Sequence, residues 1–218
     1  MCIRDRRRTQ ADFRIHQAPK SSFLVFFLVL NIWKFATAII SIPQFENANE
    51  NQLQSIIEGF FRYAGTSGWS YPSIVGSGEN ATILHYKENN SPCKNGEIVL
   101  IDAGAEFRGY AADITRSWPT NGIFTEPQKE LYQIVLDSQI AAINECVPGN
   151  PYTAPHEAAR RVLAEGLIKI GVISQTLEEA LDSKSGQLKD WYMHNTSHWI
   201  GLDAVSYTHL TLPTILLV

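Results

Sequence analysis

The stretch IDAGAEFRGYAADITRSWP, residues 101–119, decides the fold class. It holds the end of one strand-like run, residues 96–105, and nearly all of another, residues 109–118, with the linker EFRG between them. Short apolar runs separated by a glycine-containing linker are typical of an antiparallel hairpin. Asp102 and Asp113 lie inside these runs among apolar neighbours, where a carboxylate is out of place.

We expect the two aspartates to face each other across this hairpin. A turn centred between Phe107 and Arg108 pairs Asp102 directly with Asp113 on one face of the sheet. Their Cβ atoms would then be roughly 4.5–5.5 Å apart, a distance at which like charges destabilise a sheet. A one-residue bulge would break this register.

Several arrangements can make such a pair tolerable. The two carboxylates can share one proton. Arg108 or Arg116 can bridge them, or hard carboxylate oxygens can bind a divalent metal ion such as manganese, magnesium or calcium. The plainer alternative is that both acids lie at strand ends in solvent.

Histidines in loop or strand contexts add to the acids. His194 and His198 lie four residues apart in HNTSHWIGLD, but the glutamate of a helical HExxH motif is missing. The residues between them favour a turn or the start of a strand. A lone His198, or His85 in ILHY, is most often a histidine of the core. Two acids and three histidines can also converge on one pocket.

The other predicted elements complete an α+β domain. They are a helix at 50–64, loop and short strand over 71–86, a helix capped by Thr125 and Gln128 that ends at Pro148-Gly149, a helix from Thr153 to Gly171, a short helix capped by Thr176 and Glu179, and a strand-like segment around His198.

The composition argues against a nucleic-acid-binding protein and against a disulfide-stabilised secreted domain. The net charge of −4 over 218 residues gives no electrostatic footprint for nucleic acid. The three cysteines are dispersed and form no CxxC pair, which suits a reducing compartment.

The two ends of the chain differ from the middle in residue composition and hydrophobic pattern. Basic residues precede the apolar run 23–42, which reads as a signal anchor, although Asn31 and Lys34 interrupt it. MCIRDR at the start and VSYTHLTLPT near the finish resemble translated sequencing-adapter read-through. We therefore divide the chain into a non-native or anchor-like segment 1–44, a domain 45–203 and a non-native tail 204–218.

Three quoted motifs, SYPSIVGSGENATILHY, GEIVLIDAGAEFRGYAADITRSWP and YMHNTSHWIGLD, resemble the Xaa-Pro aminopeptidases (aminopeptidase P). The resemblance covers about residues 45–203, with the motifs in family order. It implies the pita-bread fold of the creatinase and aminopeptidase type, truncated at its C-terminal end. It also implies a cytoplasmic homo-oligomeric peptidase, with a membrane anchor only if residues 23–42 are native.

The resemblance also implies roles for particular residues. Asp102, Asp113 and His198 resemble three ligands of a pair of divalent metal ions, which we expect to be Mn²⁺. His85 and His194 resemble the pocket histidines that contact substrate and assist catalysis. The implied substrates are peptides with proline in the second position, and the implied reaction is attack of an activated water and release of the first residue.

This sequence departs from the family pattern after Asp203. The family's V-H-D is replaced by Ala204-Val205-Ser206, and two glutamate ligands expected further on are missing. We therefore expect this 218-residue chain to bind metal weakly, fold poorly and be inactive. Prolidase activity on Xaa-Pro dipeptides is the nearest alternative, and a non-catalytic pita-bread binding module is the other.

Overall fold

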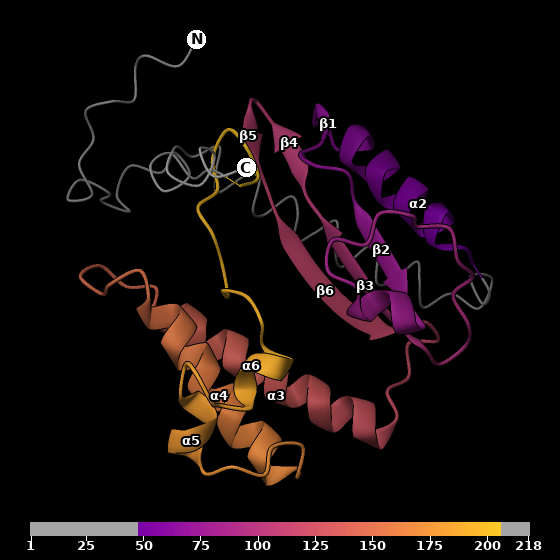
Figure 1. Ribbon diagram of the computed structural model, residues 1–218. Coiled ribbons are helices and arrows are strands. Elements are labelled where there is room, and N and C mark those ends of the chain that lie inside the picture. Colours follow the sequence, from indigo (N-terminus) through magenta and orange to yellow (C-terminus); the bar gives the residue numbers. More distant parts are fainter. Residues whose placement is uncertain (1–47, 206–218) are drawn as a thin grey trace, which may run out of the picture.

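The structure is a computed structural model that describes residues 48–205. The elements are helix α2 (Glu50–Tyr63), strands β1 (Gly68–Trp69) and β2 (Ile74–Ser77), 3-10 helix η3 (Gly78–Thr82), strands β3 (Ile98–Ala103), β4 (Ala105–Phe107), β5 (Tyr110–Ala111) and β6 (Ile114–Pro119), and helices α3 (Glu126–Asn144), α4 (Ala154–Lys169), α5 (Leu177–Leu181) and α6 (Leu188–Trp191) (Figure 1). The apolar run 23–42 and residues 206–218 of the tail lie outside the described residues. No helix within 48–205 is long and apolar enough to cross a membrane.

Helix α2 forms as the periodicity predicts. Asn49 caps it, and Gln52 returns a hydrogen bond to the Asn49 backbone, which completes a capping box. Leu53, Ile57 and Phe61 repeat on one face and are almost fully buried.

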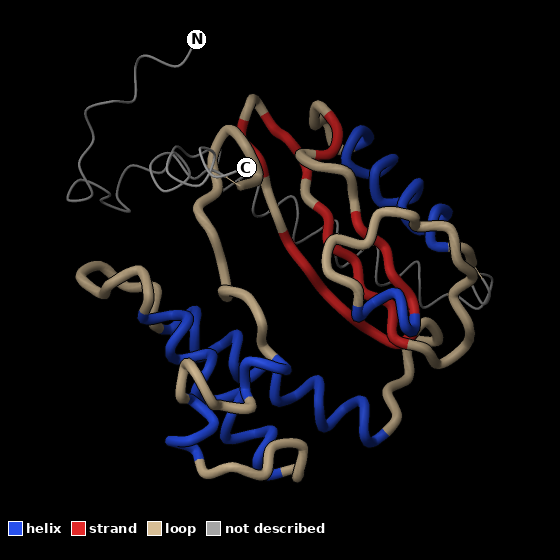
Figure 2. The backbone as a smooth tube through the Cα atoms, in the orientation of Figure 1, coloured by secondary structure: helices blue, strands red, loops and turns tan. Residues whose placement is uncertain are grey.

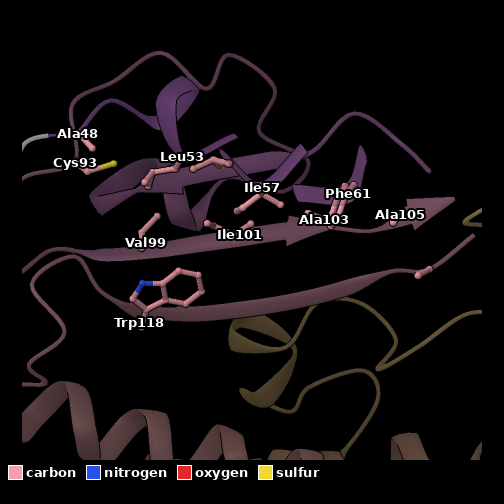
Figure 3. Packing of buried hydrophobic residues seen from close by; sticks show 12 residues of the cluster. Ala48, Leu53, Ile57, Phe61, Cys93, Val99, Ile101, Ala103, Ala105 and Trp118 are labelled. Carbon is pink, nitrogen blue, oxygen red and sulfur yellow. The ribbon is translucent and has the colours of Figure 1, made fainter. Parts of the chain in front are cut away.

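The sheet region consists of two three-stranded antiparallel ladders, β2-β3-β6 and β1-β4-β5 (Figure 2). Burial alternates along β3, so that Val99, Ile101 and Ala103 point to one face. Helix α2 covers that face (Figure 3). Asp102 therefore lies on the opposite face of β3.

The hairpin is real, but its predicted register is wrong. The turn is at Arg108-Gly109, whose φ angles are 53° and 82°, and Phe107 pairs with Tyr110. Two residues with positive φ make a type I′ turn, which fits the twist of the strands. The turn centre is thus one residue later than expected, and Asp102 pairs with Thr115 instead of Asp113.

Asp113 nevertheless stays on the face of Asp102. The ladder continues from Asp102 and Thr115 through a hydrogen bond from the Ala112 N–H to the Ala105 carbonyl, 3.0 Å. Asp113 is two residues before Thr115, so the two acids are diagonal neighbours on one face. A shift of two residues keeps the face, because side chains alternate with period two.

Gly104 marks a close approach between the two runs. A Cβ atom there would lie 1.7 Å from the Ala112 carbonyl oxygen. Ser70 closes the same junction, since its N–H bonds the Gly104 carbonyl at 2.8 Å and its hydroxyl bonds the Ala112 carbonyl at 2.6 Å. Residue 71 is therefore fixed beside both aspartates.

The remaining helices form a second layer, below the sheet in Figure 1. The predicted capping boxes at Thr125 and Thr176 are confirmed. α3 ends at Asn144, four residues before the proline expected to stop it. Buried side chains of α4, the α4–α5 loop, α5 and α6 form a separate core against Ile134 of α3, namely Leu163, Ala164, Leu167, Ile173, Ala180 and Leu188.

The expectation of a strand around His198 is wrong. Residues 193–205 contain no strand or helix, and α6 directly before them was not anticipated. A strand requires a partner ladder, but among the backbone hydrogen bonds of residues 48–205 one joins this segment to the sheet, from the Ala111 N–H to the Gly201 carbonyl, 2.8 Å. The α+β class is confirmed.

Candidate metal centre

The two aspartates share one tyrosine hydroxyl. The Tyr71 hydroxyl oxygen is 2.5 Å from Asp102 Oδ1 and 3.0 Å from Asp113 Oδ1. A phenol has a single proton, so it donates fully to one carboxylate at a time. Tyr71 therefore fixes the distance between the carboxylates but leaves most of their combined negative charge uncancelled.

His198 completes the cluster from the irregular segment. Its Nε2 is 3.2 Å from Asp113 Oδ2, on the oxygen that Tyr71 does not contact. The structure thus brings together Asp102, Asp113 and His198, from β3, the β5–β6 junction and the 193–205 segment.

The other ring nitrogen of His198 sets its tautomer. Nδ1 is 3.1 Å from the Trp199 carbonyl oxygen, which can only accept a hydrogen bond, so Nδ1 carries the hydrogen. Nε2 faces Asp113 Oδ2 at 3.2 Å, a contact in which one proton lies between the two atoms and which a bound metal ion would replace. A histidine that donates one N–H to a backbone carbonyl and presents the other nitrogen is the usual arrangement of a metal ligand.

The electrostatics of the pair are those of like charges held together. Burial, and then the neighbouring Asp102 carboxylate, raises the pKa of Asp113, against the opposing effects of the Tyr71 hydroxyl and of His198. Burial and both carboxylates also raise the pKa of Tyr71, which keeps its phenol protonated. Each shift shows that the site disfavours further negative charge.

The arginine bridge considered above is not formed. Arg116 donates to the Thr115 carbonyl at 2.7 Å, and Arg108 lies over the Phe107 ring with 5.2 Å to its centroid. Among the ion pairs of residues 48–205, none joins either aspartate to an arginine or lysine. The plainer alternative fails too, because the Asp113 side chain is only 22% exposed.

The two pocket histidines are placed less tightly. His194 is exposed, donates from Nδ1 to the Asn195 carbonyl at 2.8 Å, and its ring centroid is 6.2 Å from that of Tyr192. His85 is exposed after η3 with a φ of 53°. Within residues 48–205, neither of them hydrogen-bonds Asp102 or Asp113.

The donor set fits a hard divalent cation, but it is incomplete. Two carboxylates and one imidazole suit Mn²⁺ chemically. Within residues 48–205, no group of three or more His, Cys, Asp or Glu side chains is arranged to hold a metal ion. Tyr71 lies between the two carboxylates, so that Asp102, Tyr71, Asp113 and His198 form a chain of contacts.

Sequence reasoning missed Tyr71, although it lies inside the quoted motif SYPSIVGSG. No periodicity or spacing marks a single tyrosine in a loop. The signal that could have found it is Ser70 directly before it, but that residue's contacts with Gly104 and Ala112 span 34 and 42 residues of sequence and become visible only in the fold.

Comparison with known proteins identifies the class. The chain matches the model of metallopeptidase family M24 over residues 34–214. It belongs to that family, and the resemblance found in the sequence is confirmed.

Two curated relatives illustrate the match. An Xaa-Pro aminopeptidase of Haemophilus influenzae is 44% identical over 134 residues, which are 62% of this chain and 31% of the relative. An Xaa-Pro aminopeptidase of Escherichia coli is 41% identical over 154 residues, 71% of this chain and 34% of the relative. The chain thus spans about a third of the length of these relatives.

Solved structures agree. The aminopeptidase PepP of Pseudomonas aeruginosa superposes with a TM-score of 0.74 at 33% identity, covering 86% of this chain and 42% of that one. The low-pH form of Escherichia coli aminopeptidase P gives 0.69 at 35% identity, with coverage of 83% and 42%. The fold is the pita-bread fold of this family, as expected from the sequence.

Proposed function

We propose that this chain is part of a metal-dependent aminopeptidase that releases the first residue from peptides with proline in the second position. The observation that carries the proposal is the cluster of Asp102 and Asp113 on one sheet face with His198 packed against Asp113, in a chain of family M24. The names of the two relatives described above, both Xaa-Pro aminopeptidases, support the substrate class.

The proposed ligands are Asp102, Asp113 and His198, binding a pair of divalent ions of which Mn²⁺ is our candidate. Bound metal ions supply Lewis acidity toward the scissile carbonyl and lower the pKa of water. Tyr71 holds the two carboxylates at a fixed separation, and the Trp199 carbonyl keeps His198 in the tautomer that presents Nε2. Further ligands are needed, because these three side chains do not enclose an ion.

We assign substrate contacts to His85 and His194. Both are exposed, so a peptide can reach them. Either ring can accept or donate a hydrogen bond in its neutral form. The Nδ1–H of His194 is bonded to the Asn195 carbonyl, which leaves Nε2 facing outward as an acceptor for a substrate N–H.

The substrate chemistry favours such a site. An Xaa-Pro bond has no N–H, so an enzyme cannot grip it through a backbone donor at that position. Its recognition must use the free amino terminus, the scissile carbonyl and the proline ring. Carboxylates and a bound cation can contact the first two without any amide hydrogen bond.

The test uses the full-length product of the gene that encodes this chain. With Mn²⁺ it should release alanine from Ala-Pro-Ala and leave Ala-Ala-Ala intact, and a chelator should abolish the release. Asp113→Asn should lower the rate by about 1,000-fold or more, the scale seen when an essential catalytic group is removed. Asp137→Asn, an exposed aspartate of α3, is the matched control and should behave as wild type.

Other outcomes would overturn the proposal in defined ways. Cleavage of the dipeptide Ala-Pro but not of Ala-Pro-Ala would indicate a prolidase. Absence of any Mn²⁺-dependent hydrolysis in the full-length product would indicate a binding module. The 218-residue chain itself we propose to be inactive, and substantial release of alanine by it would refute that.

A further inference from the structure

Residues 192–205 carry His194 and His198 without regular secondary structure. One backbone hydrogen bond joins them to the sheet, and it lies at Gly201, three residues beyond His198. Something else must therefore determine where the His198 ring meets Asp113. The N-terminal end of α4 supplies such contacts.

Tyr152, just before α4, contacts the segment at Ser197 and Trp199. Its ring stacks on Trp199, with centroids 4.6 Å apart and an interplanar angle of 13°. Its hydroxyl donates to the Ser197 carbonyl at 3.2 Å. A stacked aromatic pair contributes beyond its buried area, so this contact orders both neighbours of His198.

His156, in the first turn of α4, contacts Thr196 and Tyr192, which precede His198. Its Nδ1 accepts a hydrogen bond from the Thr196 N–H at 3.2 Å and lies 3.0 Å from the Thr196 hydroxyl. A backbone N–H can only donate, so Nδ1 must be unprotonated. Its ring also lies against Tyr192, with centroids 5.5 Å apart.

We propose that Tyr152 and His156 are positioning residues that hold the 192–199 segment so that His198 Nε2 meets Asp113. Their contacts fall at Thr196, Ser197 and Trp199, on both sides of His198. The inference rests on the proposed function, because it assigns the pair a purpose in assembling the metal ligands.

The pair is separable from the helix core. The buried side chains of α4 are Ala159, Leu163, Ala164 and Leu167, none of which is in its first turn. Tyr152 lies outside the helix and is about half exposed. Substituting either residue should therefore leave α3 and α4 folded while freeing the segment.

Amide hydrogen exchange of the 218-residue chain, without metal or peptide, tests the proposal. His156→Ala should speed exchange in residues 192–205 about fivefold or more, the effect of losing one net hydrogen bond. His156→Asn keeps an acceptor near the position of Nδ1 and should restore slow exchange. Tyr152→Ala should act as His156→Ala does, and Tyr152→Phe, which keeps the stack, should be intermediate.

Arg161→Ala is the matched control, because Arg161 is exposed on α4 and pairs with Glu165 at 3.8 Å, away from the segment. It should leave exchange in residues 192–205 unchanged. Unchanged exchange in both His156→Ala and Tyr152→Ala would overturn the proposal, as would failure of Asn to rescue. If His156→Ala unfolds α4, the Tyr152 variants decide.

The consequence for metal binding is measured separately in the full-length gene product. There, His156→Ala should weaken Mn²⁺ affinity about 10-fold or more and His156→Asn should restore it, as for residues behind a ligand. An effect on exchange with no peptidase activity would overturn the proposed function but support the positioning role of Tyr152 and His156. Peptidase activity with no effect on exchange would support the proposed function but overturn the positioning role.

Discussion

The β3–β6 hairpin and the 192–205 segment hold opposite ends of one site by different means. The hairpin places Asp102 inside the β3–β6 ladder and Asp113 directly before β6, next to a junction at Gly104 that admits no side chain. The segment places His198 through a few side-chain contacts from α4 and one backbone hydrogen bond to the sheet. The acids are therefore fixed by the fold, whereas the histidine depends on local contacts that can be removed one at a time.

The largest expected effect concerns the rigid half. Gly104→Ala should destabilise the chain by about 3 kcal/mol or more, because the new Cβ meets a backbone carbonyl that cannot move alone. Chemical denaturation of the purified chain measures it. Gly59→Ala, in α2 with nothing within 4 Å of the added Cβ, is the control and should stabilise by up to about 1 kcal/mol. Equal effects of the two substitutions would contradict the junction's role.

Tyr71→Phe removes the hydroxyl between the acids. We expect a loss of about 2 kcal/mol in the free energy of unfolding at pH 7, the scale of a hydrogen bond to a charged group. Tyr63→Phe, at a tyrosine that is 87% exposed, is the control and should be neutral. A neutral Tyr71→Phe would show that the carboxylates do not need this donor.

His198→Ala tests the loosely held half. Stability of the metal-free chain should change by no more than about 0.5 kcal/mol, because a single histidine–carboxylate contact that solvent still reaches contributes little. Mn²⁺ affinity of the full-length product should nevertheless fall by at least about 10-fold. A large loss of stability in the metal-free chain would contradict the claim that His198 is held less firmly than the two aspartates.

The smallest expected effect is a dependence on pH within the segment. Burial lowers the pKa of His156 below 6.5 in the folded chain, so the unfolded state binds that proton more tightly. Its contribution to stability is thus present above pH 6.5 and is lost as pH falls through 6.5 toward the lower folded value. Exchange in residues 192–205, corrected for its intrinsic pH dependence, should speed up over that window in wild type but not in His156→Asn. Identical profiles would show that His156 does not hold Thr196.

The contrast also explains what the sequence could predict. Helices 50–63, 126–144 and 154–169 were recognisable because their apolar periodicity, and the capping box of Thr125 and Gln128 at the second, are local signals. The hairpin was recognisable as well. Its register was not, because the type I′ turn needs a positive φ at Arg108, and arginine is not a residue typical of that position.

The site shows the same division. The three ligand candidates were found by their residue types and by resemblance, and the structure brings them together. Tyr71, Tyr152 and His156 were missed because their partners lie 31 to 47 residues away in sequence and no local pattern links them.

The central claim is that Asp102 and Asp113 form a repulsive pair that a divalent cation relieves. The most direct measurement is the thermal unfolding midpoint of the 218-residue chain at pH 7 as Mn²⁺ is raised to millimolar concentration. We predict that the midpoint rises with Mn²⁺ in wild type and in Asp137→Asn, since a ligand of the folded state stabilises it. Without metal, Asp113→Asn should have a higher midpoint than wild type, equivalent to up to about 1 kcal/mol of added stability. Its midpoint should not change when Mn²⁺ is added. A wild-type midpoint that ignores Mn²⁺, or an equal rise in Asp113→Asn, would contradict the claim.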